Sequence, residues 1–298
     1  MHSVQVSTSL GKARMMIEQV KMCREDVHAR QLCAWGVVDI RPGENCTFGC
    51  KYCYIQEMGY NIMREPKPWP LSGDQIVVAL LCNRDFAPGR KGQVARIDYA
   101  CEPFHPKILK RTLEYIEAIS KHLGNPVQIV TKQHIPLELA QKLAAVCASD
   151  LDVLVSIATL DNATKLEPNA ANSTKRFESI KNLLSVGIPV ATYISPLLPG
   201  IISYNEVEKI IQLSSQAGAK AVVSSPLLLL RKDNSTMLKR LQASGFDTKE
   251  IKSRAVVRKE SFWQVDCSDL EKYVRKCATE IGLPYFLDAT CFSSYVRR

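Results

Sequence analysis

Short apolar runs alternate with longer amphipathic stretches along most of this chain of 298 residues. The apolar runs predict buried strands, and the stretches between them carry apolar residues at helical spacing. The predicted strands cover residues 35–41, 94–99, 127–130, 151–158, 188–194 and 219–224. The predicted helices cover residues 10–33, 72–82, 106–122, 136–147, 173–186, 203–217 and 268–281. Alternating strands and helices with short connections predict parallel strands and right-handed crossovers, wound into an open or closed barrel.

Local sequence signals mark where several helices begin and end. Ser72 with Gln75, and Ser203 with Glu206, have the spacing of capping boxes, in which each side chain satisfies a free backbone N–H group. Gly187 follows the fifth predicted helix and is a normal C-terminal signal. These signals support the predicted boundaries.

Composition and the N-terminal sequence favour an intracellular protein. A hydrophobic content of 46% is ordinary for a globular protein with a sizeable core. The N-terminal sequence lacks the charged and apolar regions of a signal peptide, and no apolar run approaches the roughly 20 residues that span a bilayer. We therefore expect a cytoplasmic protein without a membrane partner, in which the eleven cysteines are reduced thiols rather than disulfides.

Positive charge is concentrated near the C-terminus. The formal net charge is +9, and residues 231–259 contain nine Lys or Arg against three Asp or Glu. Such a balance attracts anions, so a nucleic acid, a phosphorylated small molecule and an acidic protein are all candidate partners. Two interpretations of the segment stay open: a solvated helical face, or a surface that contacts phosphates.

Three cysteines follow the first predicted strand at C-x3-C-x2-C spacing: Cys46, Cys50 and Cys53. Three thiolates on one loop can hold three irons of a [4Fe–4S] cube and leave the fourth iron open to another ligand. Gly49 lets the loop turn tightly, and the neighbouring aromatic residues can shield the cluster. The alternatives are a zinc site, a redox-active C-x-x-C pair and a disulfide, although no second C-x-x-C or His pair completes a four-ligand zinc site.

This triplet, with Tyr54 directly after the third cysteine, resembles the signature of the radical S-adenosylmethionine (SAM) superfamily. The runs Val153–Asp161, Leu166–Ala170 and Pro196–Gly200 resemble the spore photoproduct lyase-like branch of that superfamily. The resemblance covers about residues 40–225 and implies an α/β fold, a partial (β/α)6 TIM-type barrel with an N-terminal helix and a C-terminal extension. It also implies a [4Fe–4S] cluster and SAM as cofactors, with SAM chelated by the open iron.

On this basis the chain is expected to divide into three parts. Residues 1–34 form an N-terminal helical segment, residues 35–226 the radical SAM partial barrel, and residues 227–298 a basic C-terminal extension. A last short strand is expected over residues 284–287.

Polar residues at the predicted strand ends are the candidate site residues, because the active sites of barrel enzymes lie at the C-terminal ends of the strands. Lys132 ends a buried strand, which is costly without an anion, so it is a candidate carboxylate binder; the alternative is a lysine that snorkels to solvent. By the resemblance, Lys132 lies near the SAM carboxylate, Ser156 near the ribose and the backbone at Tyr54 near adenine. We assign Glu102 to the same cofactor-binding set. Cys101 falls where spore photoproduct lyases place a hydrogen-donating cysteine, which makes it the candidate catalytic residue.

The predicted function is that of a radical SAM enzyme of lyase-like type. It would cleave SAM reductively to a 5′-deoxyadenosyl radical and abstract a hydrogen atom from substrate, with a nucleic-acid lyase or modification activity as the first candidate. The alternatives are sulfur insertion or small-molecule radical chemistry, and a basic nucleic-acid-binding protein with a structural metal site. The expected partner is a reducing electron donor such as ferredoxin or flavodoxin, and a nucleic acid or another anionic molecule is the candidate substrate.

Five further cysteines have no cluster spacing: Cys23, Cys33, Cys267, Cys277 and Cys291. Buried cysteine behaves as a small hydrophobe, which is the simplest interpretation. A second cluster is the alternative.

Overall fold

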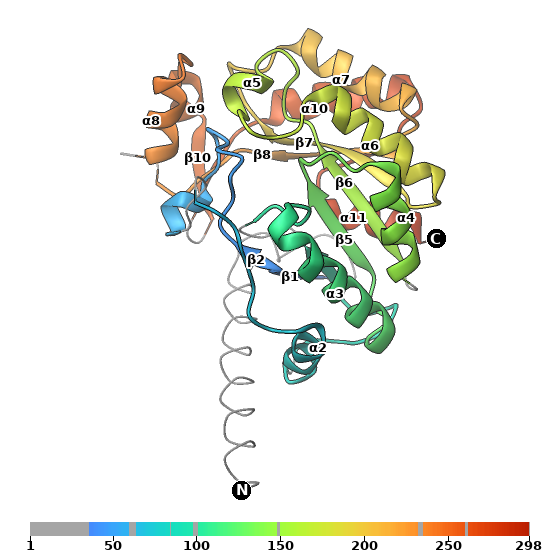
Figure 1. Ribbon diagram of the computed structural model, residues 1–298. Coiled ribbons are helices and arrows are strands. Elements are labelled where there is room, and N and C mark those ends of the chain that lie inside the picture. The colour runs from blue at the N-terminus through green and yellow to red at the C-terminus, as the bar shows by residue number, and fades with distance from the viewer. Residues whose placement is uncertain are drawn as a thin grey trace, which may run out of the picture.

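The computed structural model describes residues 36–59, 64–83, 85–97, 101–147, 150–231, 235–259 and 262–297. The predicted helix over residues 10–33, with Cys23 and Cys33, lies outside the described residues. The described elements form one large sheet with helices on both faces, together with a three-stranded and a two-stranded sheet (Figure 1).

Seven parallel strands form the main sheet, in the order in which the chain reaches them. They are β1 (Val37–Ile40), β4 (Val94–Ile97), β5 (Val127–Thr131), β6 (Leu151–Ser156), β7 (Val190–Leu197), β8 (Ala221–Pro226) and β12 (Tyr285–Phe286). The first six correspond to the six predicted strands, so the predicted partial (β/α)6 barrel is confirmed. β12 pairs with β8 and supplies the last short strand.

Helices between the strands cover one face of this sheet. They are α2 (Gly73–Leu81), α3 (Pro106–His122), α4 (Leu137–Val146), α6 (Ser173–Ser185) and α7 (Tyr204–Gln216), with the single turn α5 (Ala163–Leu166) before α6. α3 has the predicted bounds, and the other long helices end within one residue of theirs. The Ser72 hydroxyl accepts from the N–H of Gln75, whose side chain accepts from the Ser72 N–H, as the capping box predicts.

The opposite face of the sheet is packed by the last helix, α11 (Ala289–Val296), which Figure 1 shows behind β5 and β6. Its Phe292 is fully buried with Leu154, Ala191 and Val223, in an apolar cluster separate from the core under the other helices. The hydrophobic pattern does not predict this helix. The inner face of the partial barrel is therefore covered by the C-terminal part of the chain, by which we mean the described residues from 227 to 297.

The C-terminal part also contains a small antiparallel sheet that the hydrophobic pattern does not predict. Its strands are β9 (Leu228–Leu229), β10 (Ala255–Lys259) and β11 (Phe262–Val265), in the order β10-β11-β9. Two short helices, α8 (Thr236–Ala243) and α9 (Lys249–Ser253), lie between β9 and β10 in the chain. The strands are short, and an irregularity between Ala255 and Val257 interrupts their alternation. The predicted last helix is present as α10 (Ser268–Glu280) and packs against α7.

Three minor elements lie between β1 and α2: β2 (Gly43–Glu44), the 3₁₀ turn η2 (Ile55–Met58) and β3 (Lys67–Pro68). β2 and β3 pair antiparallel. Over the described part of the chain, no helix has the length and apolar character needed to cross a membrane.

A buried polar cluster joins α11 to β5 and β6. Asp152 Oδ1 accepts a hydrogen bond from Gln128 Nε2 at 2.8 Å, and the Ser293 hydroxyl donates to the other carboxylate oxygen. Gln128 Nε2 also donates to the carbonyl of Ala289 at 2.8 Å. Burial raises the pKa of Asp152 to about 6, although these hydrogen bonds lower it.

Asp152→Asn is expected to reduce the pH dependence of stability. Because the folded pKa of Asp152 lies above the ordinary value of 3.8, its protonation stabilises the fold; this contribution is fully present below the ordinary pKa and is lost as pH rises through about 6. Between pH 5 and pH 7.5, the free energy of unfolding should fall by about 1 kcal/mol more in the wild type than in Asp152→Asn. Urea unfolding at the two pH values measures the difference. Asp74→Asn, at a side chain that is 89% exposed, is the control. Equal pH slopes in the wild type and Asp152→Asn would contradict the prediction.

Candidate active site

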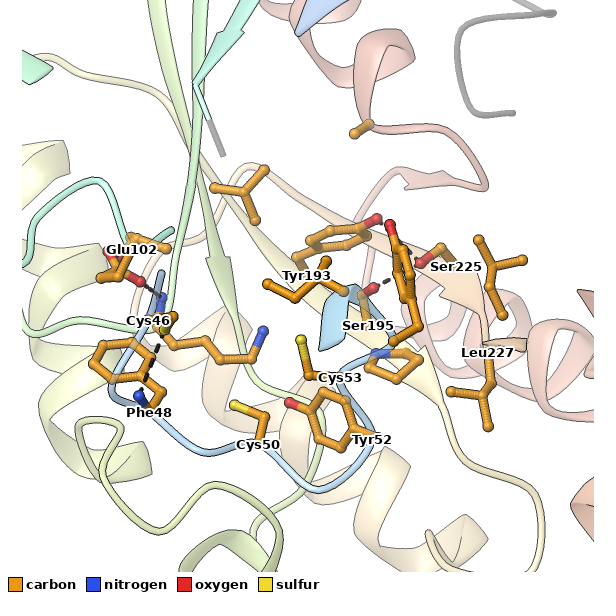
Figure 2. Close-up of a pocket in the computed structure, with 18 of the residues that line it drawn as sticks. Cys46, Phe48, Cys50, Tyr52, Cys53, Glu102, Tyr193, Ser195, Ser225 and Leu227 are labelled. Atoms are coloured by element: carbon orange, nitrogen blue, oxygen red, sulfur yellow. Dashed lines mark hydrogen bonds between the residues drawn. The ribbon is translucent and has the colours of Figure 1, made fainter. Parts of the chain in front are cut away.

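A cavity of about 280 Å³ lies at the C-terminal ends of the main strands. The cysteine loop, residues 45–54, forms one wall, and the ends of β7 and β8 form the opposite wall (Figure 2). The predicted residues that line it are Cys46, Cys50, Cys53, Tyr54, Cys101, Glu102 and Lys132. The cavity thus brings together every candidate residue from the sequence except Ser156.

The cysteine loop is held by the end of α5 and by the segment that follows it. The backbone N–H of Lys51 donates to the Leu166 carbonyl at 2.8 Å, and Asn169 Nδ2 donates to the Thr47 carbonyl at 2.8 Å. Gly49 has a φ of +65°, a left-handed conformation that glycine adopts without steric cost. These contacts fix the curl of the loop from the side away from the cavity.

The three thiols of the loop are free and line the same cavity. Burial raises the pKa of Cys46 to about 12 and raises the pKa of Cys50 and Cys53, while the Lys132 ammonium opposes the rise at all three. Within the described residues, no three His, Cys, Asp or Glu side chains lie close enough to hold one metal ion. A four-iron cube is ligated at its outer corners and accepts more widely spaced thiolates, so the donor set fits a cluster with three protein ligands.

Behind the loop, buried polar contacts run from Tyr52 to Arg176. The Tyr52 hydroxyl donates to Glu167 Oε1, and Arg176 Nη2 donates to Glu167 Oε2. Arg176 is 1% exposed and also donates to the carbonyls of Ser156 at 2.8 Å and Ala171 at 2.6 Å. Burial and the Glu167 carboxylate raise the pKa of Tyr52, which keeps its hydroxyl a donor. The network ties the cysteine loop to β6 and α6.

Glu102 positions the residue that follows β5. Its buried carboxylate accepts from the Thr131 hydroxyl at 2.5 Å and from the Lys132 backbone N–H at 3.1 Å. Burial raises the pKa of Glu102, although these bonds and the Lys132 charge lower it. Lys132 Nζ lies 5.7 Å from the centroid of the Tyr52 ring. Glu102 therefore fixes the backbone from which the Lys132 side chain reaches the cavity.

Three further predicted residues differ in their access to the cavity. Cys101 is 8% exposed and lines it, and burial raises the pKa of its thiol. Tyr54 lines it with a ring packed edge-to-face on Phe262, the centroids 5.3 Å apart. Ser156 is fully buried and does not line the cavity, and its hydroxyl donates to the carbonyl of Ser195 at 3.3 Å. A contact between Ser156 and the SAM ribose would require this hydroxyl to turn, and stays a prediction.

Three hydroxyl groups and one ion pair at the cavity are not among the predicted residues. The Ser225 hydroxyl contacts those of Tyr193 at 3.1 Å and Ser195 at 2.6 Å, on the wall opposite the cysteines (Figure 2). Arg96 of β4 lines the cavity and pairs with Asp39 of β1 at 2.8 Å. The signal in the sequence is a charged residue inside each of two apolar strands, which is stable in a buried position only when paired.

Ion pairs neutralise part of the basic segment 231–259. Arg254 donates two hydrogen bonds to the Asp269 carboxylate, at 2.6 and 3.0 Å, and pairs with Glu250 at 2.7 Å. Arg254 is therefore a structural cation rather than one open to phosphate. Phosphate contact stays a prediction for the rest of the segment.

The described cysteines of the C-terminal part do not line the cavity. Cys267 and Cys277 are buried in the apolar core, and the Cys267 thiol donates to the Leu197 carbonyl at 3.7 Å. Cys291 lies on α11 and is half-buried.

Comparison with known proteins identifies the class to which this fold and cavity belong. The model of the radical SAM superfamily matches residues 40–214, more than half of the chain. The chain therefore belongs to the radical SAM superfamily, whose members use SAM and a [4Fe–4S] cluster.

The fold is similar to that of spore photoproduct lyases. One variant lyase has a TM-score of 0.66 at 14% identity, covering 87% of this chain and 80% of that chain. Another, bound to AdoMet and a dinucleoside spore photoproduct, has a TM-score of 0.65 at 14% identity, covering 84% and 75%. Streptococcus suis SuiB bound to precursor peptide SuiA has a TM-score of 0.52 at 14% identity, covering 97% and 55%. The predicted resemblance to the spore photoproduct lyase-like branch is thus confirmed at the level of the fold.

A curated relative comes from Pseudomonas phage M6, the radical SAM Nalpha-GlyT isomerase. The chain is 22% identical to it in an alignment 264 residues long, which covers 84% of this chain and 52% of the isomerase. The chain thus spans about half the length of that relative.

Proposed function

We propose that the chain binds a [4Fe–4S] cluster through Cys46, Cys50 and Cys53 and SAM beside Lys132, and abstracts a hydrogen atom from an anionic substrate. One observation carries the proposal: three free thiols of one loop and one ammonium group line the same cavity. When bound, the cluster and SAM supply a 5′-deoxyadenosyl radical by one-electron cleavage. A reductant of the ferredoxin or flavodoxin class would deliver the electron.

The chain's own residues bind, orient and shield these groups. We expect the Lys132 ammonium to pair with the SAM carboxylate. Glu102 holds the backbone of Lys132 through a hydrogen bond from its N–H group. We expect the backbone at Tyr54 to contact adenine. Phe48 and Leu227 are buried apolar residues of the cavity wall and exclude water from the reacting atoms.

Lys132→Ala is expected to weaken SAM binding while the cluster remains. A charge-assisted hydrogen bond to a carboxylate contributes about 1.5–3 kcal/mol, which is about ten- to a hundredfold in dissociation constant. Anaerobic calorimetric titration with SAM, with iron and sulfide analysis of the same sample, measures both properties. Lys142→Ala, at an exposed position of α4, is the matched control. Equal SAM affinity in the wild type and Lys132→Ala would mean that this lysine has another role.

A nucleic acid is the substrate class that we favour. The net charge of +9 favours a polyanion over a neutral molecule. A similar lyase is bound to a dinucleoside spore photoproduct, whereas SuiB is bound to a precursor peptide, so a peptide is the competing class.

Cys101 is the candidate hydrogen donor within this function. Its thiol lines the cavity, and the raised pKa keeps the S–H bond that hydrogen-atom donation requires. Donation to a product radical breaks that S–H bond and forms a C–H bond. The resulting thiyl radical then regains hydrogen from 5′-deoxyadenosine or from an external thiol.

Anaerobic turnover tests the proposed function. Reconstituted protein is incubated with SAM, dithionite and either irradiated duplex DNA, tRNA or a peptide library. We expect about four irons per chain, 5′-deoxyadenosine formation, and a product from a nucleic acid.

Cys101→Ala should still form 5′-deoxyadenosine but stall or divert the product. If this variant gave the normal product, Cys101 would have only a structural role. Turnover with peptides alone would replace the substrate class, and no SAM cleavage would refute the function.

A further inference from the structure

The C-terminal part contacts the cysteine loop through α8, which Figure 1 shows beside the blue segment after β2. Glu57 of η2 accepts hydrogen bonds at the start of α8, from the Ser235 hydroxyl at 2.8 Å and from the Met237 N–H at 3.0 Å. Arg240, one turn further along α8, donates from Nη2 to the carbonyl of Cys53. The third cysteine is therefore held by a side chain 187 residues away in the sequence.

Arg240 is an incompletely paired cation beside the loop. Its Nε and Nη1 atoms are buried and have no hydrogen-bond partner among the described residues. A guanidinium keeps its charge in proteins, so burying it without a full set of partners costs free energy. The hydrogen bond to the Cys53 carbonyl places this charge beside the third cysteine of the loop, although Arg240 itself does not line the cavity.

We propose that Arg240 is a positioning residue that raises the reduction potential of the cluster bound by Cys46, Cys50 and Cys53. The proposal rests on the function proposed above, because it requires that cluster. Reduction adds one negative charge beside three thiolates. A fixed positive charge nearby stabilises the reduced form more than the oxidised form, and partial burial strengthens this attraction. The hydrogen bond to the Cys53 carbonyl holds the charge at a constant position relative to that ligand.

Arg240 and Lys132, the other cation near the thiols, differ in whether SAM is expected to neutralise their charge. Lys132 lines the cavity, where we expect the SAM carboxylate to neutralise it. Arg240 lies outside the cavity lining, so SAM does not neutralise it. Its charge therefore continues to act on the cluster when SAM is bound, which gives the C-terminal part a role in cluster reduction.

Anaerobic redox titration of the reconstituted protein tests this inference, with the reduced cluster followed by electron paramagnetic resonance. Arg240→Gln is expected to have a more negative midpoint potential than the wild type at equal iron and sulfide content. Lys239→Gln is the matched control, because it removes the same charge from the adjacent, exposed position of the same helix, and it should keep the wild-type potential. Arg240→Lys retains the charge and should stay close to the wild type.

Each outcome decides the matter. Equal potentials in Arg240→Gln and Lys239→Gln would mean that Arg240 only holds α8 on the loop, and the inference would be wrong. If Arg240→Gln does not retain its irons, retention by Arg240→Lys supports the role of the charge, and loss in both variants overturns it. A wild-type protein that binds no four-iron cluster would instead refute the proposed function, so the two failures are distinguishable.

Discussion

Replacing Cys50 by Ala is expected to leave a protein without a four-iron cluster and without SAM cleavage. A cluster with three protein ligands has no spare thiolate, so the loss of one leaves two of its irons without a protein ligand. Cys46→Ala and Cys53→Ala should give the same result, because all three thiols line one cavity. Iron and sulfide analysis, visible absorbance and 5′-deoxyadenosine formation measure the outcome.

The control for the loop cysteines is Cys82→Ala. Cys82 is free and exposed and does not line the cavity, so its variant should keep wild-type iron content and SAM cleavage. A cluster retained in the triple Ala variant of the loop would refute the ligand assignment. One zinc ion in place of a cluster in the wild type would support the alternative of a structural metal site.

Arg176→Ala is expected to destabilise the protein by about 3–5 kcal/mol, the effect of leaving a buried partner charge uncompensated. The Glu167 carboxylate, in a residue that is 2% exposed, would keep only the Tyr52 hydroxyl as a side-chain donor. Because Tyr52 belongs to the cysteine loop, we also expect faster loss of iron to a chelator. Anaerobic denaturant unfolding measures the first effect, and a chelation assay measures the second.

Lys175→Ala is the matched control for Arg176→Ala. Lys175 is the preceding residue of the same helix, and its ammonium pairs with Glu178 on the surface. An exposed pair of this kind contributes little to stability, so the control should unfold almost like the wild type. Similar unfolding free energies for both variants would contradict the importance of the buried network.

The βα part of the fold could be predicted because each element carries its own signal. α3 has a proline at its first position and apolar residues at helical spacing, and both of its bounds were predictable. The small sheet carries no such signal. β9 has only two residues, and its place is set by pairing with β11, where Leu229 lies opposite Trp263. Contacts between distant segments decide elements of this size.

The candidate site shows the same limit. Lys132 and Cys101 were predictable because residues that follow buried parallel strands gather at one end of a barrel. Whether Ser156 lines the cavity is harder to predict, because successive side chains of a strand point to opposite faces. A shift of one position along the strand moves a side chain from the cavity wall to the layer behind it. The contact of Arg240 with Cys53 could not be predicted, since the run of positive charge does not distinguish an exposed lysine from a partly buried arginine.

The packing of α11 on the inner face of the sheet has a consequence for the biogenesis of the protein. Gln128 reaches Ser293, 165 residues later, at 3.0 Å, so its partner is translated long after β5 and β6. Contacts of such large sequence separation form slowly, because the loop between them must first be closed. Until residues 289–296 leave the ribosome, the inner face with Leu154 stays open to water and to chaperones. Completion of the barrel is thereby a late event of synthesis, even though its six βα strands are translated much earlier.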